Sequence, residues 1–156
     1  MEKFLENLQE AERIIKTADH MVYVTFPLVQ DKILLLKILS ELKIAISKCI
    51  NSILQYEYLY KRIRLYSDSK KNFRNFQDRC AKRYDITKQE IDLIKELFDI
   101  IEKHKQSPFE FRKGDKIVIM TENFTPKSIA LEDIKKFLIL GKNILKKTLE
   151  NIKTQF

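Results

Sequence analysis

The chain has 156 residues, of which 44% are hydrophobic and 33% are charged, so it can bury a core without disulfides or a structural metal. Two glycines and three prolines are too few for an all-β protein with many tight turns, and they exclude a glycine-rich phosphate loop. The net charge of +8 favours an anionic partner such as nucleic acid. We therefore expect a single all-α domain over 1–156, a helical bundle of about five helices with one small β-hairpin before the last helix.

Location and cofactors are indicated mainly by motifs that the sequence lacks. The first residues mix acidic with apolar side chains and form no secretory signal. The most apolar stretch, 33–42, is interrupted by charges and is far shorter than the ~20 residues that span a bilayer. Cys49 and Cys80 are interpreted as small buried thiols, and no zinc-ligand spacing or nucleotide-binding motif occurs. We expect a cytoplasmic protein with no membrane partner, no metal and no cofactor.

Two long helices are expected in the first 63 residues. The first is predicted over about 2–25, ending before Pro27, because the residue before a proline disfavours helical backbone. The second, about 31–63, has a wide apolar arc, which is typical of a central helix with several neighbours. The apolar positions are Phe4, Leu8, Ala11, Ile15, Ala18 and Val22 in the first, and Leu35, Ile38, Leu39, Leu42, Ile46, Cys49, Ile50, Ile53 and Tyr56 in the second.

Turn and capping signals divide the middle of the chain. Residues 64–69 are predicted to form a turn, with Ser69 as the cap of a short helix. The buried stripe of this helix would contain Phe73, Phe76, Cys80 and Tyr84. Thr87 and Glu90 have the spacing of a capping box, in which each side chain bonds the other residue's backbone amide. They would open a helix that ends near His104.

A β pattern then interrupts the helices. Phe109 and Phe111 alternate with Glu110 and Arg112, and a Lys-Gly-Asp turn follows at 113–115. Residues 117–120 then form a β-rich apolar run, so 109–120 predict a hairpin. A lone hairpin is only marginally stable, so it should pack on the bundle or on a second chain. The last helix is expected over about 131–153, where Gly141 suggests the close approach of another helix. A homodimer through the hairpin or the long helix is a possible assembly.

Positive charge is concentrated in one short segment. Between Tyr58 and Arg83 lie nine basic residues and two acidic ones, so this segment carries seven of the eight net charges. We call the nine the basic cluster: Lys61, Arg62, Arg64, Lys70, Lys71, Arg74, Arg79, Lys82 and Arg83. Arginine forks bind phosphates at two points, and the interleaved Tyr58, Tyr60 and Tyr66 can stack on unpaired bases.

The basic cluster therefore predicts a non-catalytic, nucleic-acid-associated protein that contacts RNA in preference to DNA. Phosphate neutralisation would supply the affinity, and the three tyrosines would supply any preference among bases. The same pattern also arises from a solvated lysine-rich face with no anionic partner. A further alternative is a protein-interaction or structural module that contacts no nucleic acid and uses the hairpin and the last helix.

A different function is suggested by Arg13 and His20 in the first helix. Seven residues make almost two helical turns, so both side chains lie on one face, nearly opposite the apolar stripe. An arginine, six intervening residues and a histidine resemble the motif of the HEPN domain superfamily, small helical bundles that include dimeric ribonucleases. By this resemblance Arg13 would hold an RNA phosphate and His20 would assist proton transfer in a cleft between two chains. More broadly, the chain resembles uncharacterised archaeal helical proteins of similar length.

Overall fold

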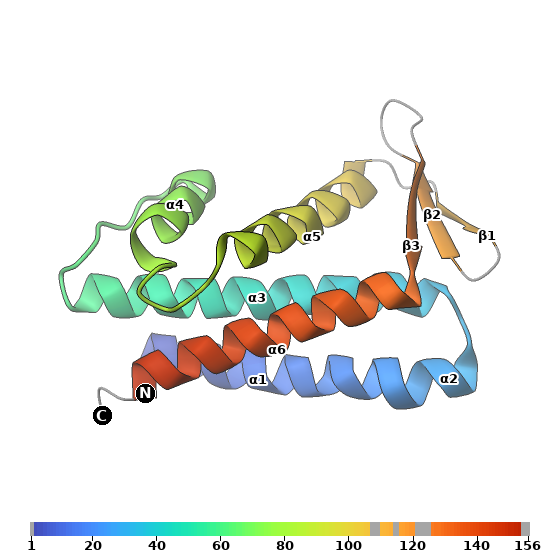
Figure 1. Ribbon diagram of the computed structural model, residues 1–156, viewed down its shortest axis with the longest axis horizontal. Coiled ribbons are helices and arrows are strands. Elements are labelled where there is room, and N and C mark those ends of the chain that lie inside the picture. Colours follow the sequence, from blue (N-terminus) through green and yellow to red (C-terminus); the bar gives the residue numbers. More distant parts are fainter. Residues whose placement is uncertain (1, 107–109, 114–115, 121–125, 154–156) are drawn as a thin grey trace.

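A computed structural model describes residues 2–106, 110–113, 116–120 and 126–153. It confirms an all-α bundle with a β-hairpin before the last helix (Figure 1). Five helical rods are present in the described part of the chain, two of which contain a π-helical turn, η1 or η2. The elements are α1 (Lys3–His20), η1 (Met21–Thr25), α2 (Phe26–Val29), α3 (Ile33–Leu59), α4 (Ser69–Asn75), η2 (Phe76–Cys80), α5 (Lys88–Gln106), β1 (Glu110–Lys113), β2 (Lys116–Met120), β3 (Pro126–Ala130) and α6 (Leu131–Lys153).

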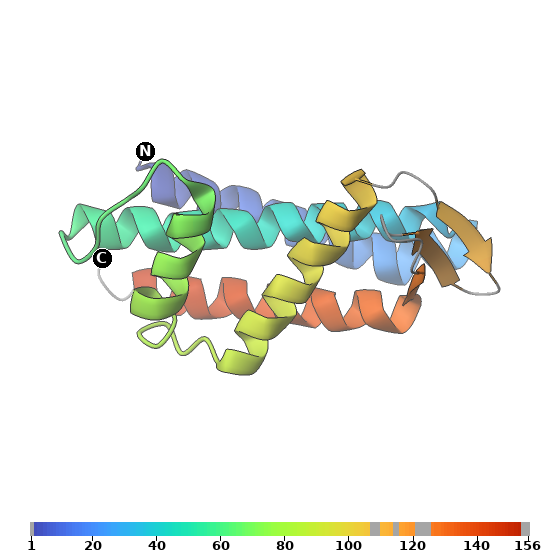
Figure 2. The same ribbon diagram turned by 90° about the horizontal axis from the view of Figure 1, so that it is seen from above.

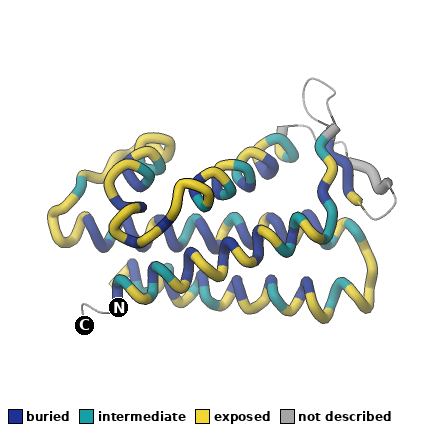
Figure 3. Tube along the Cα trace, viewed as in Figure 1, coloured by how far each residue is buried: buried dark blue, intermediate teal, exposed yellow. Residues whose placement is uncertain are grey.

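Helix α3 is the centre of the bundle, as its wide apolar arc predicts. Helices α1 and α6 pack along one side of it, and α4 and α5 cross its other side (Figures 1 and 2). Fourteen of its 27 residues are buried, which few peripheral helices achieve. The apolar arc of α3 is therefore covered by helices of the same chain. Figure 3 shows buried residues on the facing sides of the rods and exposed residues on their outer sides.

The predicted hairpin is present and is extended by a strand that the sequence did not suggest. Strands β1 and β2 pair antiparallel, and β3 adds antiparallel to β2. Ile117, Val118, Ile119 and Ile129 are buried, so the sheet closes one end of the bundle near α5 and α6 (Figure 1). β3 begins with Pro126, an edge position where a missing N–H is tolerated. Its sequence is short and has one large apolar residue, Ile129, which explains why it gave no signal. Residues 114 and 115 of the predicted turn lie outside the described residues.

The predicted end of the first helix is wrong. The rod continues through Pro27 to Val29 instead of stopping at residue 25. A proline ring in a regular helix clashes with the carbonyl four residues earlier. Here the turn just before Pro27 widens to η1, in which the Phe26 amide bonds the Met21 carbonyl five residues back, and this wider turn accommodates the ring.

Three rods end on non-glycine residues in the left-handed conformation: Gln30, Lys61 and Asp85, with φ of 52°, 58° and 56°. At Lys61 the amide of Arg62 bonds the Glu57 carbonyl (3.0 Å) and that of Lys61 bonds the Tyr58 carbonyl (2.9 Å). This is the Schellman arrangement, usually built with glycine. It ends α3 at Leu59, four residues earlier than predicted.

Of the two predicted helix caps, one is confirmed and the other lies one residue earlier than predicted. The capping box is confirmed, because the Glu90 amide bonds Thr87 Oγ1 (3.1 Å) and the Thr87 amide bonds Glu90 Oε1 (3.0 Å). The cap of α4 is Asp68 and not Ser69, since Asp68 Oδ1 accepts from the Lys70 amide at 2.9 Å. A Cβ on Gly141 would lie 2.8 Å from Ile15 Cδ1, which confirms the close approach of α1 and α6.

No helix in the described ranges is long and apolar enough to cross a membrane. Both cysteines are free and buried, as predicted. Burial raises the pKa of each thiol to about 12. The thiols therefore stay protonated in the core.

Replacing Gln30 by glycine should stabilise the protein, because glycine adopts the left-handed conformation without the strain of a side chain. We expect Gln30→Gly to raise the free energy of unfolding, measured by urea denaturation, by about 0.5–1 kcal/mol. Gln9 is an exposed residue in the interior of helix α1, where glycine is unfavourable. Gln9→Gly should therefore lower the free energy of unfolding by about the same amount. If the two variants lose stability equally, residue 30 does not adopt this conformation in solution.

Candidate nucleic-acid interface

The basic cluster lies at the end of the bundle opposite the sheet (Figure 1). The chain leaves α3, reverses at Lys61, runs through residues 60–68 and returns along α4 and η2 across α3. We call residues 60–68 the basic loop. This reversal brings the last turn of α3, the basic loop and η2 together, although they span more than twenty residues of sequence. In Figure 3 the basic loop and the start of α4 are almost wholly exposed.

Two asparagines of α4 hold the basic loop in place. The Asn72 side chain accepts a hydrogen bond from the Tyr66 amide (2.8 Å) and donates one to the Tyr66 carbonyl (2.6 Å). Asn75, one turn later, donates from Nδ2 to the Arg64 carbonyl (2.7 Å). Side-chain amides that satisfy loop backbone groups replace the hydrogen bonds that regular structure would provide. The loop is therefore fixed in the free protein.

A buried carboxylate lies beneath the basic loop. Glu57, in the last turn of α3, is 2% exposed. Its Oε2 accepts hydrogen bonds from Nη1 of Arg62 (2.9 Å) and from Nη1 of Arg83 (3.3 Å). Burial and the nearby negative charge of Glu57 raise the pKa of the Tyr84 phenol, which keeps that hydroxyl neutral. Glu57 thus joins the basic loop to the turn after η2 through two arginines that are 21 residues apart in sequence.

Four cationic side chains surround one cavity of about 480 Å³ above this carboxylate. We call it the basic cavity. Its lining residues are Lys61, Arg62, Ile63, Arg64, Tyr66, Asn75 and Arg79, none of which is acidic. Arg62 shares its charge with Glu57, and its guanidinium stacks 5.3 Å from the centre of the Tyr60 ring. Lys61, Arg64 and Arg79 form no ion pair with any carboxylate among the described residues.

The remaining predicted residues are distributed around the basic cavity. Arg83 is held by Glu57, and Lys70 lines a second cavity, between α3, α4 and α5, together with Phe73 and Phe98. Lys71, Arg74 and Lys82 are exposed and do not line the basic cavity. Tyr58, Tyr60 and Tyr66 are all exposed. Four of the nine residues of the basic cluster therefore line the basic cavity, and the other five lie outside its lining.

Sequence reasoning missed Glu57, Asn72 and Asn75. A signal existed for Glu57, since position 57 continues the apolar row of positions 46, 50 and 53 on α3. An acidic residue in such a row, followed by arginines, indicates a buried ion pair. Nothing in the sequence marked the two asparagines, because their partners are backbone groups of a loop.

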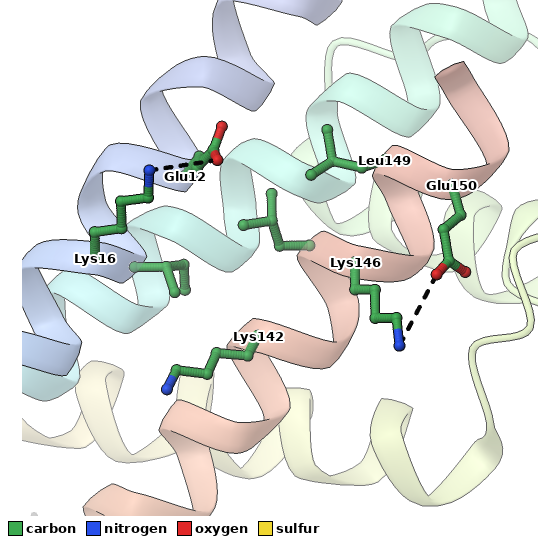
Figure 4. Close-up of a pocket in the computed structure, with 8 residues that line it drawn as sticks. Glu12, Lys16, Lys142, Lys146, Leu149 and Glu150 are labelled. Carbon is green, nitrogen blue, oxygen red and sulfur yellow. Dashed lines mark ion pairs between the residues drawn. The ribbon is translucent and has the colours of Figure 1, made fainter. Parts of the chain in front are cut away.

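Another cavity, of about 410 Å³, lies between α1 and α6, and its positive charges are compensated by carboxylates (Figure 4). Its three lysines all have carboxylate partners. Lys16 pairs with Glu12 and Lys146 with Glu150, as the dashed lines in Figure 4 show, and Lys142 pairs with Asp19. Charges that are compensated within the chain attract an anion weakly. The contrast makes the basic cavity the stronger candidate for an anion site.

Arg13 and His20, which suggested a ribonuclease, are exposed on α1 as their spacing predicts. Arg13 forms an ion pair with Glu10, and this contact raises the pKa of Arg13 and lowers that of Glu10. His20 Nδ1 lies 3.5 Å from Thr25 Oγ1. Neither residue lines the basic cavity or the cavity between α1 and α6. The catalytic reading remains a prediction without a structural observation behind it.

Comparisons with known proteins supply no relative. No protein-family model matches the sequence, and comparison with curated proteins and with solved structures gives no match. Among the residues that the structure describes, no three His, Cys, Asp or Glu side chains are grouped so that they could hold a metal ion.

Removing both arginines from Glu57 should destabilise the fold, because a buried carboxylate would lose its compensating charges. We expect Arg62→Met with Arg83→Met to lower the free energy of unfolding by about 3 kcal/mol at pH 7, measured by urea denaturation. Adding Glu57→Gln should recover most of this loss, since no buried charge then remains. The Arg62 and Arg83 side chains are 37% and 51% exposed, so water can solvate them when Glu57 is replaced. Glu57→Gln alone should therefore lower the free energy of unfolding less than the double arginine variant does. A double variant as stable as the native protein would contradict this role of Glu57.

Proposed function

We propose that the protein binds RNA, without cleaving it, through the basic cavity and the tyrosines around it. The observation that carries this proposal is the convergence of Lys61, Arg62, Arg64 and Arg79 on one cavity with no acidic lining residue. Like charges brought this close repel one another, and the repulsion is relieved when an anion enters. Phosphate is the anion that arginine forks bind best.

Single-stranded RNA fits this surface better than a duplex does. Tyr58, Tyr60 and Tyr66 are exposed on both sides of the loop reversal, next to the cations. In a single strand the unpaired bases can stack on such rings, whereas in a duplex they already stack on one another. A cavity is also a poor match for the regular rows of phosphates on a helix. Double-stranded nucleic acid is therefore expected to bind more weakly.

The mechanism is phosphate neutralisation combined with stacking. Each phosphate that meets a lysine or arginine releases condensed counterions, so affinity falls as salt rises. Base stacking on the tyrosines adds a contribution that depends little on salt or sequence. The buried Glu57 keeps Arg62 and Arg83 in fixed positions, which reduces the ordering cost of binding.

The protein should bind labelled single-stranded RNA with a strong salt dependence, which fluorescence anisotropy across a salt series measures. We expect log K to fall with log salt with a slope of roughly −0.7 per phosphate contact. Replacing Arg64 and Arg79 by glutamine removes two cations that have no carboxylate partner among the described residues, and it should flatten this slope by about 1.4. Duplex RNA and duplex DNA of equal length should bind less tightly.

A matched control separates the basic cavity from net charge. Lys37→Gln with Lys88→Gln removes the same charge from exposed positions on α3 and α5, outside the basic loop, and should leave the slope close to the native value. Equal effects of the two double variants, or no binding at low salt, would contradict the proposal. The RNA should also remain intact on a denaturing gel. Cleavage that is lost in His20→Ala would replace the proposal with the ribonuclease alternative.

A further inference from the structure

Four cations of the basic cluster line a single cavity. A groove that follows an RNA backbone presents successive cations to successive phosphodiesters along its length. Here Lys61, Arg62, Arg64 and Arg79 surround a single cavity at the tip of the bundle, where the chain reverses after α3. We infer that the basic cavity binds the terminal phosphate monoester of an RNA strand. This inference rests on the RNA binding proposed above and identifies which part of the RNA the cavity recognises.

Charge distinguishes a terminal phosphate from an internal one. A phosphodiester carries one negative charge, whereas a phosphate monoester carries about 1.5 to 2 at pH 7 and offers three acceptor oxygens. Lys61, Arg64 and Arg79 lack carboxylate partners among the described residues, and the charge of Arg62 is partly compensated by Glu57. Three uncompensated cations around one cavity match a dianion better than a monoanion.

The cavity is also built before any ligand arrives. The left-handed Lys61 turns the chain so that the Arg62 side chain is held between Glu57 and the Tyr60 ring. Asn75 and Asn72 fix the Arg64 and Tyr66 segments from below. Binding therefore orders few backbone groups, and this preorganisation favours one compact ligand over an irregular surface contact.

The dimensions of the cavity suit a terminal nucleotide and exceed those of an isolated phosphate. Its volume of about 480 Å³ lies in the usual range for small-molecule sites, ~300–1,000 Å³. Tyr66 lines the same cavity and is 43% exposed, so its ring is accessible to the base or sugar next to the phosphate. The larger cavity between α3, α4 and α5 is lined by Asp99 and Glu102 as well as lysines, and its mixed charge suits a phosphate less well.

The test compares one single-stranded RNA sequence in three forms: with a 5′-phosphate, with a 3′-phosphate, and with hydroxyl groups at both ends. The native protein should bind one of the phosphorylated forms about tenfold more tightly than the hydroxyl form, because added hydrogen bonds to a charged group each contribute on this scale. The preferred form shows whether the cavity binds the 5′ or the 3′ end of the RNA. Inorganic phosphate should compete with the phosphorylated RNA and have less effect on the hydroxyl form.

Two variants assign the preference to the basic cavity. Arg64→Gln with Arg79→Gln should reduce the tenfold preference to about twofold or less. Lys61→Gly removes another cation while relieving the left-handed strain, so it should weaken the preference without loss of stability. Lys37→Gln with Lys88→Gln should retain the full preference. Native protein that binds all three RNAs equally would overturn the inference and leave the RNA-binding proposal standing.

Two other outcomes are equally decisive. If none of the three RNAs binds at low salt, the RNA-binding proposal itself fails and the inference fails with it. If the Arg64→Gln/Arg79→Gln variant keeps the native preference, the terminal phosphate binds elsewhere and the assignment to the basic cavity is wrong. Thermal denaturation of every variant confirms that a lost preference reflects the site and not unfolding.

Discussion

The pairing of the buried Glu57 carboxylate with Arg62 and Arg83 is the interaction on which the candidate site depends. Taking a carboxylate out of water costs several kcal/mol unless cations and hydrogen bonds compensate it. Here the compensation comes from one arginine in the basic loop and one in the turn after η2, so both segments are tied to the last turn of α3. The fold thereby places further cations, Arg64 and Arg79, around the same cavity. The cationic lining of the basic cavity follows from how the core is closed at this end.

The chain has few glycines, and this affects the reversal after α3, next to the basic cavity. With two glycines in the chain, the reversal after α3 is made by Lys61 in a left-handed conformation that glycine normally supplies. Such strain costs of the order of 1 kcal/mol and persists where the surroundings fix it. The π-helical turn η2 adjoins the site as well, and such turns are frequent at functional sites. A lysine at this position adds a cation to the basic cavity, which glycine could not do.

Much of the architecture could be predicted from the sequence, because its signals are local. The apolar arc of α3, the Thr87–Glu90 capping box and the bounds of α6 depend on residues close together in the chain. Two features were missed for different reasons. Strand β3 exists because β2 pairs with it, and the helix passes Pro27 because the local turn before it widens to η1, for which the sequence gave no separate signal. The basic cluster was visible in the sequence, but its gathering around one cavity depends on Glu57, Asn72 and Asn75, whose partners are far away in sequence or are backbone atoms.

The most direct test of the central claim, that RNA binds at the basic cavity, is to map the contact itself. Single-stranded RNA containing a photoreactive uridine is crosslinked to the native protein at low salt, and the modified peptides are identified by mass spectrometry. The account predicts crosslinks in the segment from Tyr58 to Arg83, with Tyr66 among the modified residues, since it lines the cavity and is exposed. Crosslinks confined to the paired lysines between α1 and α6, or spread evenly over the surface, would contradict it.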